Sequence, residues 1–149
     1  MPRRPAAAAL ALLAASALAG CGKVPAAPTP SPASRLSPDQ RAVCQQVLAV
    51  NGVRSAAFER RWQEVLAAVA KGDEAASASA GEIATQELYE WARELEQIRP
   101  QATDAQLKQG LGTAVGELKR LASVDDETPA AEMLGKVGAA EAAVTRPCQ

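Results

Sequence analysis

The sequence predicts an all-α fold, an antiparallel up-down-up-down four-helix bundle, over residues 37–149. Four successive segments carry apolar residues at three- and four-residue spacing, which is the period of one helix face. No run with the two-residue alternation of a strand separates them, and the composition is rich in Ala, a strong helix former. The connections between the segments are short, so neighbouring helices should run antiparallel.

The first helix is expected to begin at Pro38. Ser37 and Gln40 form a capping box, and Pro38 occupies the first helical position, where its missing N–H costs nothing. Asn51-Gly52 interrupts the segment and could kink or split it. The apolar positions of the stripe are Val43, Val47, Val50, Phe58, Trp62, Val65 and Val69.

The second helix has two candidate starting points, Asp73 and the capping box formed by Ser79 and Glu82. Pro100 ends it, because the residue before a proline is biased away from helical geometry. The stripe between these limits is the most regular in the chain and consists of Ala84, Leu88, Trp91, Leu95 and Ile98.

The third helix is predicted to be capped by Thr103 and Gln106, and its apolar face is formed by Leu107, Leu111, Ala114, Leu118 and Leu121. Its three glycines either weaken it or permit close contact with another helix: Gly110, Gly112 and Gly116. The fourth helix begins at Thr128-Pro129 and is stopped by Pro147. Its expected stripe contains Leu134, Val137, Ala140 and Val144.

The first residues have the pattern of an export signal. Two arginines precede an apolar run, Ala6–Ala19, which is shorter than the roughly 20 residues that a membrane span needs. The run ends in Leu18-Ala19-Gly20-Cys21, which resembles the lipobox of bacterial lipoproteins. The resemblance implies that the chain is cut before Cys21 and lipidated on its sulfur. The acyl chains would hold the protein on the extracytoplasmic face of a membrane.

Residues 21–36 are expected to form a tether. After the lipidated cysteine they are rich in Pro, Ala and Ser, a composition that cannot build a core. Such a disordered segment favours extended geometry, at about 3.1 Å per residue. The sequence therefore divides into a signal peptide (1–20), a tether (21–36) and a helical bundle (37–149).

Cys44 and Cys148 are left once the resemblance assigns Cys21 to lipid. An even pair in an exported domain is most simply one disulfide, here closing a loop of roughly 100 residues worth ~4–5 kcal/mol in chain entropy. In a bundle with an even number of antiparallel helices, or rods, the start of the first helix and the end of the last helix lie at the same end of the bundle. The pair therefore fits four rods, and we expect the first helix to run as one rod to Lys71.

The bundle is acidic. Of the chain's 16 basic residues, 4 precede residue 37 and 12 lie in the bundle against all 17 acidic residues, which gives a net charge near −5. Such a surface disfavours nucleic acid and direct docking on anionic lipid. The connections at the end away from the tether are both acidic, at Gly72-Asp73-Glu74 and Asp125-Asp126-Glu127. They either bind a divalent cation or a basic partner, or stabilise the helix N-termini that follow them; the second interpretation is favoured.

Phe58, Trp62 and Trp91 are candidates for an apolar cleft between helices, although large aromatics are more often core. The glutamates of the second helix fall mostly off its stripe, as on a solvated face. The chain has no His, so the Glu-x-x-His pattern of di-iron bundles is missing. We predict no catalytic residue, metal or cofactor. The expected function is a lipid-anchored domain that binds another envelope or extracellular component; the alternative is a carrier of an apolar or amphipathic small molecule between the helices.

Overall fold

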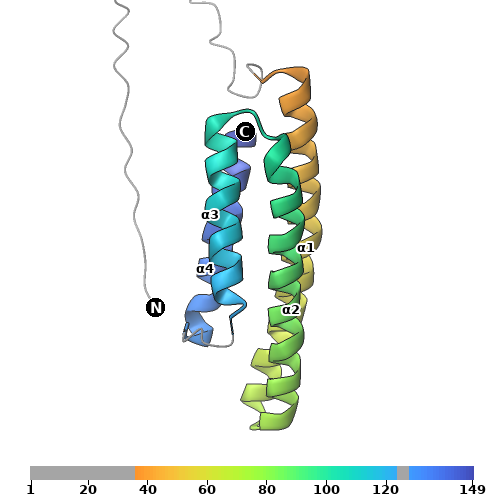
Figure 1. Ribbon diagram of the computed structural model, residues 1–149. Helices are drawn as coiled ribbons and strands as arrows, with labels where there is room; N and C mark the ends of the chain where they lie inside the picture. Colours follow the sequence, from red (N-terminus) through yellow and green to blue (C-terminus); the bar gives the residue numbers. More distant parts are fainter. Residues whose placement is uncertain (1–35, 124–127) are drawn as a thin grey trace, which may run out of the picture.

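The computed structural model describes residues 36–123 and 128–149. It is an antiparallel up-down-up-down bundle of four helices, as the apolar stripes predict (Figure 1). The helices are α1 (Pro38–Ala70), α2 (Glu74–Ile98), α3 (Ala105–Leu121) and α4 (Ala130–Thr145), and short 3-10 turns follow α2 and α4 at η2 (Arg99–Gln101) and η3 (Arg146–Cys148). The signal peptide, Cys21, the tether up to residue 35 and the acidic residues 125–127 lie outside the described residues.

Side chains at the helix starts supply the hydrogen bonds that free backbone N–H groups need. Ser37 accepts from the backbone N–H of Gln40 at 3.2 Å, as predicted. At α2 the earlier of the two candidate starts is used, since the Asp73 side chain accepts from the N–H of Ala76 at 3.0 Å. Gly72 precedes this cap with φ of 70°, a left-handed conformation that glycine adopts without strain.

The start of α3 differs from the prediction by one residue. The cap is Asp104, which accepts from the N–H of Leu107 at 2.8 Å, in place of Thr103. Thr103 is not free to cap, because its hydroxyl accepts a hydrogen bond from the Gln40 side-chain amide. The same glutamine accepts from the N–H of Asp104 at 3.3 Å, so it ties the start of α1 to the α2–α3 connection.

Helix α1 is continuous through Asn51 and Gly52, as expected of a single first rod. Its 33 residues make a rod of about 50 Å, whereas α4 has only 16 residues. The difference in length is absorbed at one end of the bundle, where the α1–α2 hairpin extends beyond the α3–α4 hairpin (Figure 1). Among the described residues, part of the hairpin therefore has no second pair of helices beside it.

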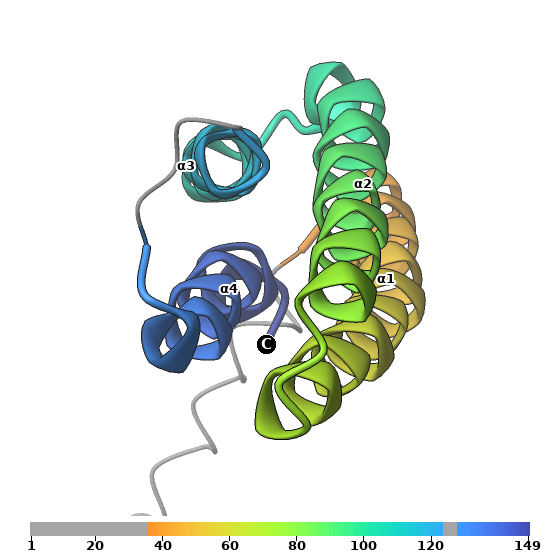
Figure 2. The same cartoon turned by 90° about the horizontal axis from the view of Figure 1, so that it is seen from below.

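The core lies between the two hairpins, which Figure 2 shows end-on with α1 and α2 on one side and α3 and α4 on the other. The predicted stripes supply most of it, including Val47, Leu88, Leu111 and Val144. One position on α4 was predicted wrongly. Leu134 is 39% exposed and Met133 is buried, because Met133 lies over Val137 and Ala140 on the inward face while Leu134 is turned toward the α1 side.

Cys44 and Cys148 form a disulfide with their Cα atoms 5.4 Å apart. The bond joins the first part of α1 to the turn that follows α4, as four antiparallel rods require. The start of α1 and the end of the chain therefore lie at the same end of the bundle, opposite the tip of the α1–α2 hairpin (Figure 1).

Candidate functional site

The three aromatic residues considered for a cleft are buried in the core. Phe58 and Trp91 have no exposed surface and Trp62 is 8% exposed. The rings of Phe58 and Trp62 stack with their centroids 5.7 Å apart, and both side chains belong to the apolar cluster shared by all four helices. The groove described below is lined by other residues. The arrangement is that of core packing, the commoner of the two interpretations.

A polar pair lies inside this core. The indole N–H of Trp91 donates to the side-chain oxygen of Asn51 at 2.9 Å, and both residues are buried. The Asn51 amide nitrogen and the Trp62 indole nitrogen are buried without a hydrogen-bond partner. The Asn51 side chain therefore makes one of the hydrogen bonds that it can form. That bond joins α2 to α1 at the middle of the long hairpin.

The two acidic turns are described only in part. Asp73 caps α2 and Glu74 is exposed in its first turn, so both serve the N-terminus of that helix. Asp125, Asp126 and Glu127 lie outside the described residues. Since the α1–α2 hairpin is the longer one, its turn projects beyond the region where α3 ends and α4 begins (Figure 1). Within residues 36–123 and 128–149, no three acidic or cysteine side chains are grouped as a metal site would need.

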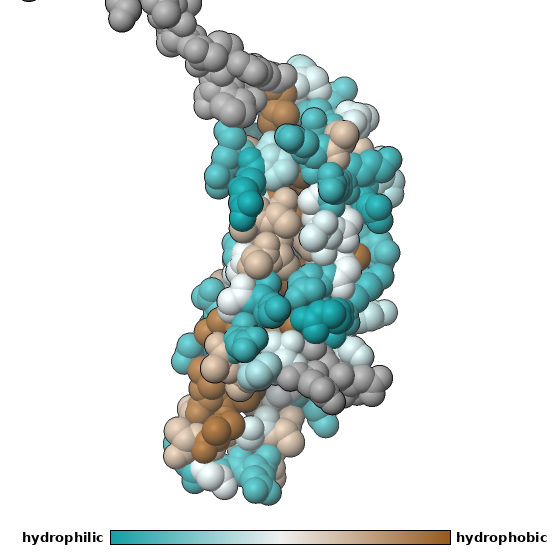
Figure 3. Space-filling view, turned by 90° about the vertical axis from the view of Figure 1, so that its left-hand side faces the viewer, coloured by the Kyte–Doolittle hydropathy of each residue, from teal (hydrophilic) through white to brown (hydrophobic). Residues whose placement is uncertain are grey.

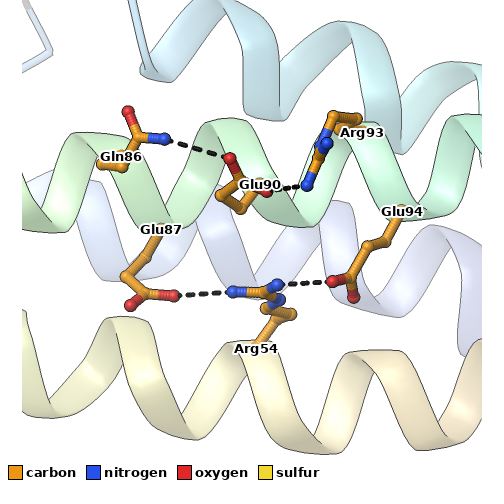
Figure 4. Close-up of polar contacts among 6 residues, drawn as sticks. All are labelled: Arg54, Gln86, Glu87, Glu90, Arg93 and Glu94. Atoms are coloured by element: carbon orange, nitrogen blue, oxygen red, sulfur yellow. Dashed lines mark hydrogen bonds and ion pairs between the residues drawn. The ribbon is translucent and has the colours of Figure 1, made fainter.

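The glutamates of α2 include two that do more than face solvent. Arg54 of α1 lies between Glu87 and Glu94 of α2 and hydrogen-bonds to both (Figure 4). The Arg54–Glu87 distance is 3.1 Å, and both side chains are about a quarter exposed. The hydrogen bond from Arg54 holds the pKa of Glu94 below its ordinary value, and Glu94 in turn raises the pKa of Arg54. Glu90 instead pairs with Arg93 on its own helix (Figure 4).

A groove lies between α1 and α4, the seam where the first and last helices meet. It encloses about 540 Å³ and extends along roughly two turns of each helix. Its apolar lining includes Ala56 of α1 and Val137 of α4, with Leu134 exposed at its edge. We call this the α1–α4 groove, and its lining residues are Ser55, Ala56, Glu59, Arg60, Gln63, Leu134, Val137, Gly138 and Glu141.

Charged groups line both walls of the α1–α4 groove. Glu59 and Arg60 come from α1 and Glu141 comes from α4. Glu141 accepts a hydrogen bond from the Ser55 hydroxyl at 3.2 Å, the one side-chain hydrogen bond between α1 and α4 in the described part of the chain. None of the ion pairs among the described residues involves Glu59, Arg60 or Glu141.

Apolar surface continues past the groove. Ser55 of α1 lies beside Glu141 of α4. Because the two helices are antiparallel, Ala130, which begins α4 and is 11 residues before Glu141, lies at the level of Leu66, which is 11 residues after Ser55. Beyond Leu66 no part of α4 remains to cover α1, and Val69 is 59% exposed. The space-filling view shows apolar side chains gathered over the lower part of this side of the molecule, down to the tip of the hairpin (Figure 3).

Glycine shapes the groove as well as the helix contacts. A Cβ atom built at Gly138 would meet nothing within 4 Å, so the groove is open at this point of α4. At Gly110 of α3 a Cβ would overlap the carbonyl oxygen of Ala143, so that glycine permits the close approach of α3 and α4. Gly116 has open space around it and makes no such contact.

The sequence pattern singled out none of the charged groove residues. Two features of the sequence point to the groove. The first and fourth apolar stripes have unequal lengths, and α4 has two adjacent apolar residues, of which only one can face the core. The described helices include none that is both long and apolar enough to span a bilayer. Comparison with known protein families, curated proteins and solved structures finds no match to this chain.

Proposed function

We propose that this protein is a bacterial lipoprotein whose helical bundle binds another component of the cell envelope and performs no catalysis. The observation that carries the binding role is the α1–α4 groove, in which apolar residues lie between charged residues of α1 and the carboxylate of Glu141 on α4. A carboxylate on either side of an apolar strip offers both contact area and charge for recognition.

The proposed anchor fits this role. Lipid on Cys21 would lie 15 residues before Leu36, which leads into α1 at the disulfide end of the bundle. The groove lies on the second half of α1, toward the tip of the hairpin. A bundle held at its disulfide end would therefore present the groove away from the bilayer, toward soluble or membrane-bound partners.

The anchoring is tested with Cys21→Ser in the full-length chain. We expect the wild-type protein to sediment with membranes, and mass spectrometry of its first peptide to show a lipidated residue 21 with residues 1–20 removed. The variant should carry no lipid and should keep residues 1–20, because in lipoproteins the cut follows lipidation. A wild-type protein that begins elsewhere, or a variant that is still cut before residue 21, would contradict the lipoprotein assignment.

The binding role is tested by amine-reactive cross-linking in intact cells, using surface lysines such as Lys71 and Lys136. We expect the wild-type protein to form a discrete heteromeric adduct that survives stringent purification. Cells in which it yields only the free monomer would count against a binding function.

The carrier role is the second candidate, because a hollow of about 540 Å³ lies within the ~300–1,000 Å³ range of small-molecule sites. Titration with dodecylamine and with palmitate, followed by NMR of Leu134 and Val137, tests it. Saturable shifts confined to these residues would support the carrier, and unchanged spectra would exclude it for these two probes.

A further inference from the structure

We infer that the α1–α4 groove receives an amphipathic helix of a partner protein, with apolar residues along one face and basic residues at its edges. This inference rests on the proposed function, since it names the chemistry of the component that the bundle binds. It follows from the shape of the seam, from its length and from its charges.

The shape of the seam suits a rod. Its walls are two antiparallel helices, with residues at three- and four-residue spacing on each: Ser55, Glu59 and Gln63 on α1, and Leu134, Val137 and Glu141 on α4. Ridges of a third helix fit between such rows. An amphipathic helix can bury one apolar face in a groove of this kind while its other face stays in water.

The length of the groove points the same way. The α1–α4 groove runs from Ser55 to Gln63 on α1 and from Leu134 to Glu141 on α4. At 1.5 Å per residue this stretch of α1 is about 12 Å long, a little over two helical turns. A small molecule needs enclosure over most of its surface, which an open seam of this length supplies poorly.

The charges select a basic partner. Glu59 stands on the α1 wall and Glu141 on the α4 wall, so a cationic edge on either side of the incoming helix meets a carboxylate. Arg60 is the one cation among the lining residues. The surrounding bundle, with 12 basic and 17 acidic residues, is itself acidic and attracts a basic segment from a distance.

The test places a photo-reactive phenylalanine derivative in the full-length chain, expressed in the cells that produce it. One position is Gln63, which lines the groove, and the other is Val53, which is 68% exposed and lies outside it. We expect Gln63 to form an adduct with a second protein and Val53 to form little. The cross-linked segment, sequenced by mass spectrometry, should have apolar residues at helical spacing and more Lys and Arg than Asp and Glu.

Charge removal supplies the matched control. The double variant Glu59→Gln/Glu141→Gln should lower the Gln63 adduct about fivefold, because both edges of the docked helix lose their partners. The variant Glu82→Gln/Glu132→Gln removes the same charge at exposed positions outside the groove and should leave the adduct unchanged. Circular dichroism and the intact disulfide establish that all variants fold.

The outcomes separate the two proposals. An adduct at Val53 and none at Gln63 would show that the partner binds outside the groove, and it would leave the proposed binding function in place. An adduct at Gln63 with a second copy of this chain, with an acidic segment or with a small molecule would overturn the basic helix. Equal adduct yields in the two charge variants would also overturn the proposal that the occupant is a basic helix. No adduct at either position would count against both proposals.

Discussion

Asn51 is the one buried amide that bonds across the long hairpin, and it is incompletely satisfied. It accepts from Trp91 at 2.9 Å while its own amide nitrogen has no partner. Apolar neighbours surround this pair, so the bond is strong, but either group costs free energy when left alone. The bond joins α1 to α2 inside the core.

Replacing Asn51 should cost more when Trp91 is present than when Phe replaces it. Asn51→Leu leaves the Trp91 N–H buried without an acceptor, and we expect a loss of about 1–3 kcal/mol in unfolding free energy. In a Trp91→Phe background the same substitution should cost clearly less. Urea denaturation of the four proteins of the cycle measures the coupling. Additive effects would show that the hydrogen bond does not hold the two helices together.

Arg54 gives the hairpin an acid-sensitive contact. Its hydrogen bond depresses the pKa of Glu94, so the pair stabilises the fold above the unfolded-state value of about 4.3 and the gain is lost as the pH falls through the folded-state pKa. Both side chains are partly exposed, which limits the effect to about 0.5–1 kcal/mol. Glu94→Gln should therefore destabilise at pH 7 and have little effect at the lowest pH where the protein still folds. An equal loss at both pH values would exclude the ion pair as its cause.

At the scale of the helices, Gly110 and Gly116 of α3 should respond oppositely to the same substitution. Gly110→Ala forces a Cβ against the Ala143 carbonyl oxygen of α4, and we expect a loss of about 1–3 kcal/mol. Gly116→Ala meets open space and should gain up to about 1 kcal/mol in helix propensity. Thermal unfolding of the two variants, each with one added methyl group, checks this. A stable Gly110→Ala protein would mean that α3 and α4 are not in close contact there.

The helices were predictable where local chemistry acts alone. Capping at Ser37 and Asp73 and the regular stripe of α2 needed only the residues beside them. The errors arose where a distant residue decides. Thr103 does not cap α3 because Gln40, far away in sequence, takes its hydroxyl. Leu134 was placed in the core because its spacing to Val137 is helical, and only the position of α1 distinguishes it from Met133.

The candidate site was less accessible to sequence reasoning than the fold. Aromatic residues drew the prediction toward Phe58, Trp62 and Trp91, which the structure places in the core. The groove is a property of two helices far apart in the chain, and its residues carry no motif. The single long first helix was expected from the sequence, but the exposure of Val69 was not, because its spacing places it on the core stripe.

At the scale of the whole molecule, the disulfide between Cys44 and Cys148 closes nearly the entire bundle, with a sequence separation of 104. On the chain-entropy model its reduction should lower the unfolding free energy by about 4–5 kcal/mol, because the unfolded chain regains the freedom of a long loop. Guanidinium denaturation with and without a phosphine reductant measures this. A loss below about 1 kcal/mol would show that the bond contributes little to holding the first and last helices together.

The central proposal is that the α1–α4 groove is the binding surface of the bundle. Substitutions at two glycines of α4 test it most directly. Gly138→Leu and Gly135→Leu both enter open space and both remove a helix-weakening glycine, but only Gly138 lines the groove. Both variants should therefore raise the melting temperature, and only Gly138→Leu should abolish the partner adduct formed from Gln63 in cells. An adduct that persists undiminished in Gly138→Leu, or that is lost equally in Gly135→Leu, would contradict the account.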